Sequence, residues 1–197
     1  MNTHVVCLHC NGKYSPDYVN KLYSMVDRHT TVPYDFTCYT DNPTGINVPH
    51  LPLLEPVMTG WWNKLNFFKL KEHILFLDLD IIIINNIDSL FMLNEDFAVL
   101  RCPSYRRHKF NTTIIFFVPS KCRIQINDIH RHYSDQEYIQ AHLKAKKVFI
   151  EDLRIVSYKY NILQLRQDPT KAKIVYCHGE PKPHELTHLP WVQEHWR

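Results

Sequence analysis

The first half of the chain alternates between two hydrophobic patterns. Stretches rich in apolar residues predict strands at residues 4–10, 34–41 and 74–84. Apolar side chains with helical spacing predict helices at residues 15–30 and 60–73. Strands that alternate with helices in this way are typical of a parallel sheet with crossover helices.

The second half continues with shorter elements. Its apolar runs and helical spacing predict strands at residues 96–102, 110–119 and 173–179 and a helix at 134–146. Residues 147–161 are expected to be short extended pieces, and residues 181–197 a Pro-rich tail that ends in a helix. No repeat or linker divides the chain, so we expect one α/β domain over residues 1–197. Its central sheet should be mostly parallel and flanked by helices.

The composition indicates which binding partners and which cellular compartment to expect. A formal net charge of +3 is too small to indicate a nucleic-acid-binding protein. The first residues lack the basic start and apolar run of a secretory signal, and no apolar run is long enough to span a bilayer. We therefore expect a cytoplasmic monomer with free thiols. Cys7 and Cys10 form a lone CxxC, without the second pair that a zinc site needs.

Two carboxylates interrupt the most hydrophobic strand. Asp78 and Asp80 lie between the apolar residues 74–77 and 81–84. Side chains two residues apart on a strand share a face, so these acids would converge and repel each other. A divalent cation between them, Mn²⁺ or Mg²⁺, would remove the conflict. The alternative is that both acids cap helices or pair with lysine or arginine.

Polar residues at strand ends are the first candidates for ligand contacts, because ligands bind open α/β sheets at the carboxyl ends of the strands. The residues concerned are His9, Cys10, Asn11, Thr40, Asp41, Asp78, Asp80, His178 and Gly179. They follow strands that are far apart in the sequence, so one edge of the sheet would bring them together.

Short motifs follow one another along the chain in a characteristic order. They are YTD at residues 39–41, FLDLDIIIINNIDSLF at 76–91, FNTTIIFF at 110–117, SDQEYI at 134–139 and HGEPKPH at 178–184. Together they resemble the motifs of GT-A-fold glycosyltransferases that use nucleotide sugars. FLDLD resembles the DxD motif, and HGEPKPH is similar to the H-x-G-x-x-K-P-W motif of the retaining, glycogenin-like group. His184 stands where that motif has Trp, and Thr113 stands where Gly is common.

The resemblance implies a role for each matching residue. A Mn²⁺ or Mg²⁺ ion would be held by Asp78, Asp80 and His178. Donor contacts would come from Leu8, His9, Cys10, Asn11, Tyr14, Thr40 and Asp41 at the base and ribose, and from Lys64, Leu79, Gly179 and Lys182 at the diphosphate or sugar. The catalytic end would comprise Asp135, Gln136 and Asn111, with Thr112 also facing the acceptor.

The residues themselves leave a structural alternative open at several of these positions. Asp135 would suit the N-cap of a helix. Lys64 would suit a solvated lysine beside core tryptophans. Asp41 would suit an ordinary turn, and His178 a histidine of the core or surface.

The resemblance implies metal-dependent transfer of a hexosyl or deoxyhexosyl group from a UDP-sugar to a glycan or protein-linked glycan, with retention. Residues 1–100 would bind the nucleotide sugar, and residues 101–197 the acceptor, metal and diphosphate. The compact length also resembles transferases of large DNA viruses of algae, which implies a viral protein in the host cytoplasm. Two alternatives stay open: a catalytically silent nucleotide-sugar-binding module, and a metal-dependent nucleotidyltransferase or phosphohydrolase.

Overall fold

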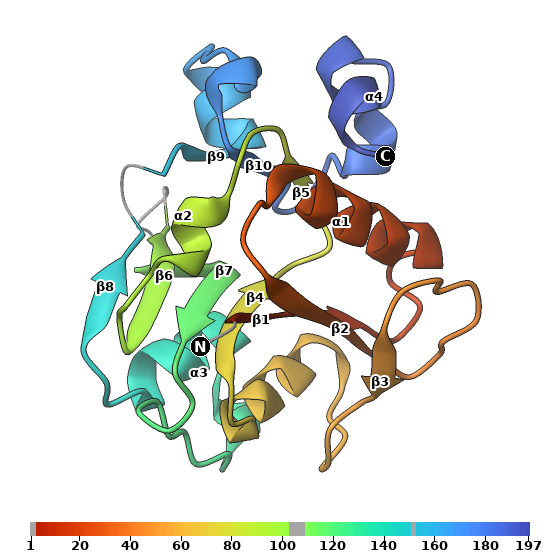
Figure 1. Ribbon diagram of the computed structural model, residues 1–197. Coiled ribbons are helices and arrows are strands. Elements are labelled where there is room, and N and C mark those ends of the chain that lie inside the picture. Colours follow the sequence, from red (N-terminus) through yellow and green to blue (C-terminus); the bar gives the residue numbers. More distant parts are fainter. Residues whose placement is uncertain (1–2, 103–108, 151–152) are drawn as a thin grey trace.

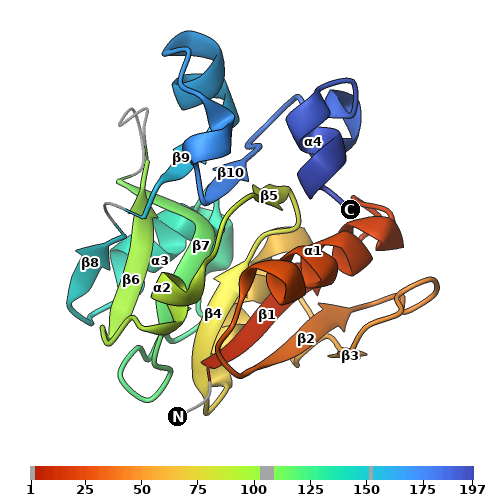
Figure 2. The same cartoon turned by 45° about the horizontal axis from the view of Figure 1, so that its top comes forward.

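A seven-stranded mixed sheet forms the centre of the computed structural model, which describes residues 3–102, 109–150 and 153–197 (Figure 1). The strand order is β3-β2-β1-β4-β7-β6-β8. These strands are β1 Thr3–His9, β2 Tyr34–Thr40, β3 His50–Pro52, β4 His73–Leu77, β6 Phe97–Arg101, β7 Phe110–Phe117 and β8 Lys147–Phe149. A smaller sheet of order β5-β10-β9 joins β5 Ile81–Ile83, β10 Ile174–Tyr176 and β9 Ile155–Ser157 (Figure 2).

The expectation of a mostly parallel sheet is confirmed. Strands β3, β2, β1 and β4 run parallel, and β8 is parallel to β6. Strand β7 is antiparallel to both of its neighbours, β4 and β6. Helices or helical segments separate β1 from β2 and β2 from β4 along the chain, as the long crossovers between parallel strands require.

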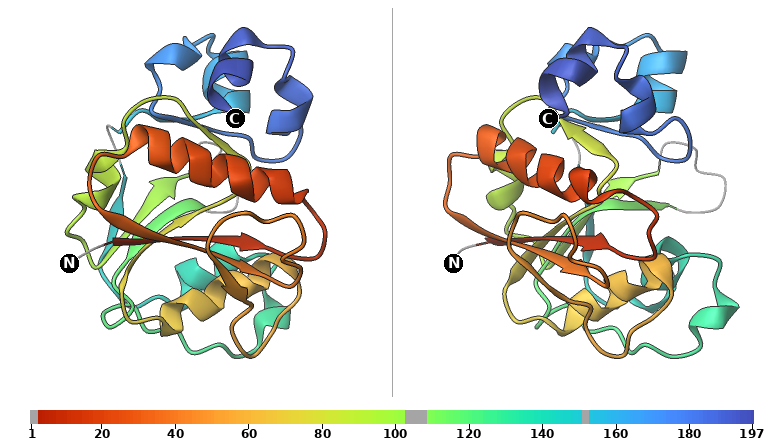
Figure 3. Two further views of the ribbon diagram at one scale, coloured as in Figure 1. Left: turned by 45° about the vertical axis from the view of Figure 1, so that its right-hand side comes forward. Right: turned by 90° about the vertical axis from the view of Figure 1, so that its right-hand side faces the viewer.

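Helices cover both faces of the large sheet (Figure 3). Helix α1 (Pro16–His29) packs Val19, Leu22 and Met25 against one face. The 3₁₀ helix η1 (Gly60–Lys69) and helix α3 (Asp135–His142) cover the other with their apolar side chains. The remaining helical segments are short: α2 Asp88–Phe91, η2 Ile129–Arg131, η3 Tyr158–Gln164, η4 Pro169–Lys171, η5 Pro183–Leu186 and α4 Pro190–His195.

The expectation of one continuous strand at residues 74–84 is wrong. Strand β4 ends at Leu77, and β5 begins at Ile81 in the smaller sheet. The amide of Asp78 still bonds the carbonyl of Thr113 beside β4 (2.9 Å), whereas the carbonyl of Asp80 accepts from the amide of Cys177 after β10 (2.9 Å). The chain therefore crosses between sheets over the two acids, where their carboxylates can leave the apolar interior.

Three other expectations change in detail. The helix predicted at residues 60–73 ends at Lys69 and is a 3₁₀ helix. The strand predicted at residues 173–179 is limited to Ile174–Tyr176, which leaves His178 and Gly179 in a loop. Part of the extended stretch at residues 147–161 is the π-helix η3, and residues 151–152 lie outside the described residues.

The six cysteines, including Cys7 and Cys10, are thiols. In the part of the chain that the structure describes, no helix combines the length and apolar character needed to traverse a bilayer.

Candidate active site

A cavity of about 460 Å³ opens where β1 and β4 end. Its walls come from the loop after β1, the start of η1, the crossing between the two sheets, β7 and the start of α3. The lining residues are Leu8, Cys10, Asn11, Lys13, Tyr14, Thr59, Gly60, Trp61, Lys64, Asp78, Leu79, Asp80, Thr112, Ser134, Asp135 and Gln136. Most of the residues that the sequence assigned to donor binding, metal binding and catalysis therefore share one cavity.

Lys64 connects two of the acids in this cavity. Its ammonium lies 2.9 Å from Oδ2 of Asp135 and 3.4 Å from Oδ1 of Asp78. It also donates to the carbonyl of Thr112 (3.2 Å), and the Thr112 hydroxyl donates to Asp135 (2.8 Å). Lys64 is only 4% exposed, so the alternative of a solvated lysine is wrong. Burial lowers its pKa, but the carboxylates of Asp135 and Asp78 outweigh burial and raise the pKa above the ordinary lysine value.

Lys182 forms the second ion pair, with Asp80. Its ammonium donates to Oδ2 of Asp80 (2.6 Å) and to the carbonyl of Cys177 (3.1 Å). The hydroxyl of Tyr14 donates to the same carboxylate oxygen (3.1 Å). Asp80 and Lys182 are 102 positions apart in the sequence, so this pair ties the C-terminal loop to the crossing between the sheets. His184 holds the same loop to α1, since its Nδ1 lies 2.5 Å from the Tyr18 hydroxyl.

Negative charge exceeds positive charge around the ion pairs. The carboxylates of Asp78, Asp80 and Asp135 face the ammonium groups of Lys64 and Lys182. Burial raises the pKa of Asp78 above the ordinary aspartate value, and repulsion from Asp80 and Asp135 adds to the effect, although Lys64 opposes it. The Asp78 side chain is still 32% exposed, toward the cavity. A cation bound there would relieve the repulsion.

The proposed ligands are of the chemical types that bind a divalent metal, but their side chains do not surround a common point. Two carboxylates and an imidazole are the ligand types that suit Mn²⁺. Within residues 3–102, 109–150 and 153–197, however, no three His, Cys, Asp or Glu side chains converge as ligands. His178 is exposed, its Nδ1 lies 3.3 Å from the Ser157 hydroxyl, and the Lys182 ammonium lies against Asp80.

Several predicted donor or acceptor contacts lie outside the cavity wall. His9 is buried, and its ring bridges the Tyr14 carbonyl (2.9 Å) and the Thr40 hydroxyl (3.0 Å). Asp41 accepts from the amide of Asn11 (2.9 Å), so it shapes the loop after β1. Asn111 is buried on β7, where its Oδ1 accepts from the amide of Thr113 (2.9 Å). His9, Asp41 and Asn111 therefore hold neighbouring residues in place and do not line the cavity.

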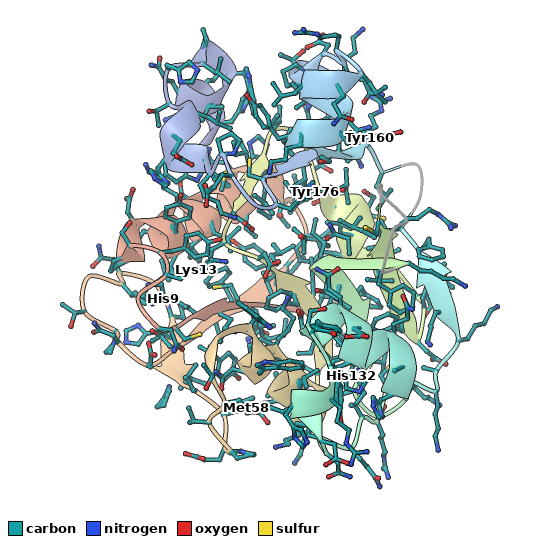
Figure 4. All side chains as sticks on the ribbon, turned by 180° about the vertical axis from the view of Figure 1, so that it is seen from behind. His9, Lys13, Met58, His132, Tyr160 and Tyr176 are labelled. Carbon is teal, nitrogen blue, oxygen red and sulfur yellow. The ribbon has the colours of Figure 1, made fainter. Side chains whose placement is uncertain are left out.

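Two wall residues, Lys13 and Thr59, had no signal in the sequence. Lys13 follows β1 beside His9, as Figure 4 shows, and Thr59 precedes η1. Ser134 is the N-cap of α3 and accepts from the amide of Glu137. The cap role is therefore filled by Ser134, which leaves the Asp135 side chain to bind Lys64. Trp61 is 50% exposed at the cavity, so it is not a core residue.

No protein-family model and no curated protein matches the sequence. Solved structures do match. The glycosyltransferase GlyE of Streptococcus pneumoniae TIGR4 matches with a TM-score of 0.68 and 12% identity, over 98% of this chain and 63% of that chain. The galactosyltransferase LgtC, solved with donor and acceptor sugar analogs, matches with a TM-score of 0.68 and 12% identity, over 97% and 94%. The chain has the GT-A fold.

A third GT-A structure is similar over the whole of its length. It is a glycosyltransferase involved in the glycosylation of the major capsid of PBCV-1, with a TM-score of 0.59 and 13% identity, over 98% of this chain and 100% of that chain. Identities this low establish the GT-A fold and leave the reaction to be argued from the cavity.

Proposed function

We propose that the protein is a glycosyltransferase that moves a sugar from a UDP-sugar to a glycan or protein-linked glycan, with retention. The observation that carries the proposal is the convergence of Asp78, Asp80, Asp135 and Lys64 on one cavity of a GT-A fold, with Lys182 ion-paired to Asp80. Such a site can hold the diphosphate of a donor and the sugar attached to it.

The loop after β1 is the proposed base and ribose site. Leu8, Cys10, Asn11 and Tyr14 line the cavity there. The ring of Tyr14 already packs on Tyr18, with 4.7 Å between centroids, which fixes its orientation. A planar base would therefore meet a rigid aromatic wall. Residues 1–100 would bind the nucleotide sugar, and residues 101–197 would contribute Lys182 at the diphosphate and the acceptor side.

The proposed metal is Mn²⁺ or Mg²⁺, held by Asp78, Asp80 and His178. When bound, it would neutralise the negative charge that develops on the departing diphosphate. Within the ion pairs, three carboxylates face two ammonium groups, and this excess of negative charge supports a cation at this point. Lys182, as a point charge four residues after His178, is the proposed diphosphate contact from the same loop.

The state of the carboxylates supports retention. An inverting enzyme needs a carboxylate free to take the proton of the acceptor hydroxyl. Oδ2 of Asp135 already accepts from Lys64 and Thr112, and Asp78 is engaged by Lys64. The next residue on the cavity wall, Gln136, has an amide that cannot serve as a base. We propose that Asp135 and Gln136 instead bind and orient the donor sugar.

Trp61 is the proposed platform for a sugar ring, since half of its surface is exposed at the cavity. Replacing Trp61 with Ala is expected to lower kcat/KM about fivefold, because stacking on an aromatic face contributes roughly 1 kcal/mol. Trp61→Phe keeps an aromatic face and should retain most of the rate. Initial rates for both variants measure the effect, and equal losses in Ala and Phe would contradict a stacking role.

The proposal is tested by calorimetric titration of the wild-type protein with UDP, with and without MnCl₂. Binding that strengthens with Mn²⁺ is expected, and a folded protein that binds UDP in neither condition would refute the proposal. Incubation with a panel of UDP- and GDP-sugars then separates the alternatives. Sugar transfer or donor hydrolysis supports a transferase, nucleotide binding without turnover indicates a silent module, and phosphate release or nucleotidyl transfer indicates the third class.

The acceptor is proposed from the likeness to the capsid-glycosylating enzyme of PBCV-1. A protein-linked glycan would suit a viral protein that works in the host cytoplasm. Transfer to a deglycosylated and a native capsid glycoprotein, compared in the same assay, tests this acceptor class.

A further inference from the structure

Lys159 lies beside the loop that carries His178, Gly179 and Lys182. A Cβ atom placed on Gly179 would come within 2.9 Å of the Lys159 ammonium nitrogen, so this ammonium rests against the Gly179 backbone. Gly179 has a φ of +64°, which favours glycine. Lys159 is half-buried and belongs to η3, an element that none of the recognised motifs includes.

Strand register explains why these distant residues meet. Strands β9 and β10 are parallel, and Ser157 pairs with Tyr176 at their carboxyl ends. The chain continues from Ser157 into η3 and from Tyr176 into the 178–182 loop. Figure 4 labels Tyr160 in η3 and Tyr176 at the end of β10. The Ser157 hydroxyl, 3.3 Å from Nδ1 of His178, joins them. The carboxyl ends of parallel strands are the expected place for a ligand.

Lys159 differs from Lys64 and Lys182 in the charged groups that surround its ammonium. Lys64 is paired with Asp135 and Asp78, and Lys182 is paired with Asp80. Among the residues that the structure describes, no carboxylate forms an ion pair with Lys159. A half-buried ammonium loses part of its hydration and gains most from an anion that arrives later. Burial is the largest effect that lowers the pKa of His178, and the positive charges of Lys159 and Lys182 lower it further. The charges of both lysines are therefore felt at His178.

We infer that Lys159 is a donor-binding residue whose ammonium, beside the Gly179 backbone, contacts the diphosphate of the nucleotide sugar. The inference rests on the proposed function and adds a contact from η3 to it. Because Lys182 is already neutralised by Asp80, Lys159 supplies positive charge that the ion pairs of the cavity do not. Gly179 leaves the space in which the ammonium and the phosphate oxygens can meet.

The test compares the affinities of UDP and uridine for Lys159→Met, which keeps the side-chain stem and removes the charge. Calorimetry in MnCl₂ should show UDP affinity reduced about tenfold, since a hydrogen bond to a charged group contributes that much or more. Uridine, which lacks phosphate, should bind as it does to the wild type. Lys159→Arg should restore most of the UDP affinity. Lys171→Met, the same change at an exposed lysine of η4, should leave both affinities unchanged.

Each other outcome counts against the inference. Equal UDP affinities for Lys159→Met and the wild type would overturn it while the proposed function stands. Equal losses of UDP and uridine would show a structural role. A wild type that binds no UDP would overturn the proposed function and this inference together. If Lys159→Met does not fold, Lys159→Gln replaces it: the charge is again removed while the side chain keeps a polar end, and UDP affinity should again fall while uridine affinity holds.

Discussion

Replacing Asp80 with Asn is expected to lower the rate of sugar transfer by about a thousandfold, because the variant loses the carboxylate proposed to bind the metal. The same carboxylate accepts from Lys182 and Tyr14, so its loss also releases the C-terminal loop from the crossing between the sheets. Asn has nearly the same shape as Asp, and the chain should still fold. Initial rates with a donor that the wild type uses, at saturating MnCl₂, measure the effect.

Asp128 offers a matched control for this change. Its side chain is exposed, and its backbone lies in the left-handed region (φ +52°), which Asn tolerates well. Asp128→Asn should therefore leave the rate unchanged. A folded Asp80→Asn variant that retains Mn²⁺-stimulated turnover would show that Asp80 does not bind the metal and that the metal assignment is wrong.

The order of β1, β2 and β4 and of the helices between them was predictable, because these strands are rich in apolar residues and the helices have their own periodicity. The same reasoning failed at Asp78 and Asp80. Apolar residues on both sides of the acids suggested one strand, whereas β4 and β5 belong to different sheets. A local pattern cannot reveal this, because the partner of β5 is β10, far along the chain.

The partners of the charged residues were likewise hidden. The sequence placed Lys64 beside two tryptophans and left a solvated lysine as an alternative, but β7 and α3 bring Thr112 and Asp135 over it. The motif around Lys182 suggested a diphosphate contact, while its pairing with Asp80 depends on the smaller sheet. Lys159 had no motif at all, since only the register of β9 and β10 brings it to Gly179.

Replacing Lys64 with Met is expected to lower the free energy of unfolding by about 3–5 kcal/mol, because removing one member of a buried ion pair leaves uncompensated charge behind. Here Asp135 and Asp78 would both lose their cation, and Thr112 would lose a donor to its carbonyl. The folded state raises the pKa of Lys64, so this stabilisation is fully present at neutral pH. It should be lost only as the pH rises through the raised pKa. Urea unfolding at pH 7 measures the difference.

Variants at Lys21 and Asp135 are the controls for the stability loss expected of Lys64→Met. Lys21 pairs with Asp17 across one turn of α1 at a partly exposed position, so Lys21→Met should cost less than about 1 kcal/mol. In Lys64→Met combined with Asp135→Asn, the unpaired charge of Asp135 is removed, and part of the lost stability should return. Additive losses would mean that the two side chains do not interact, which would contradict the 2.9 Å ion pair. A stable double variant that binds no donor would show that Lys64, Asp135 or both serve the ligand as well as the fold.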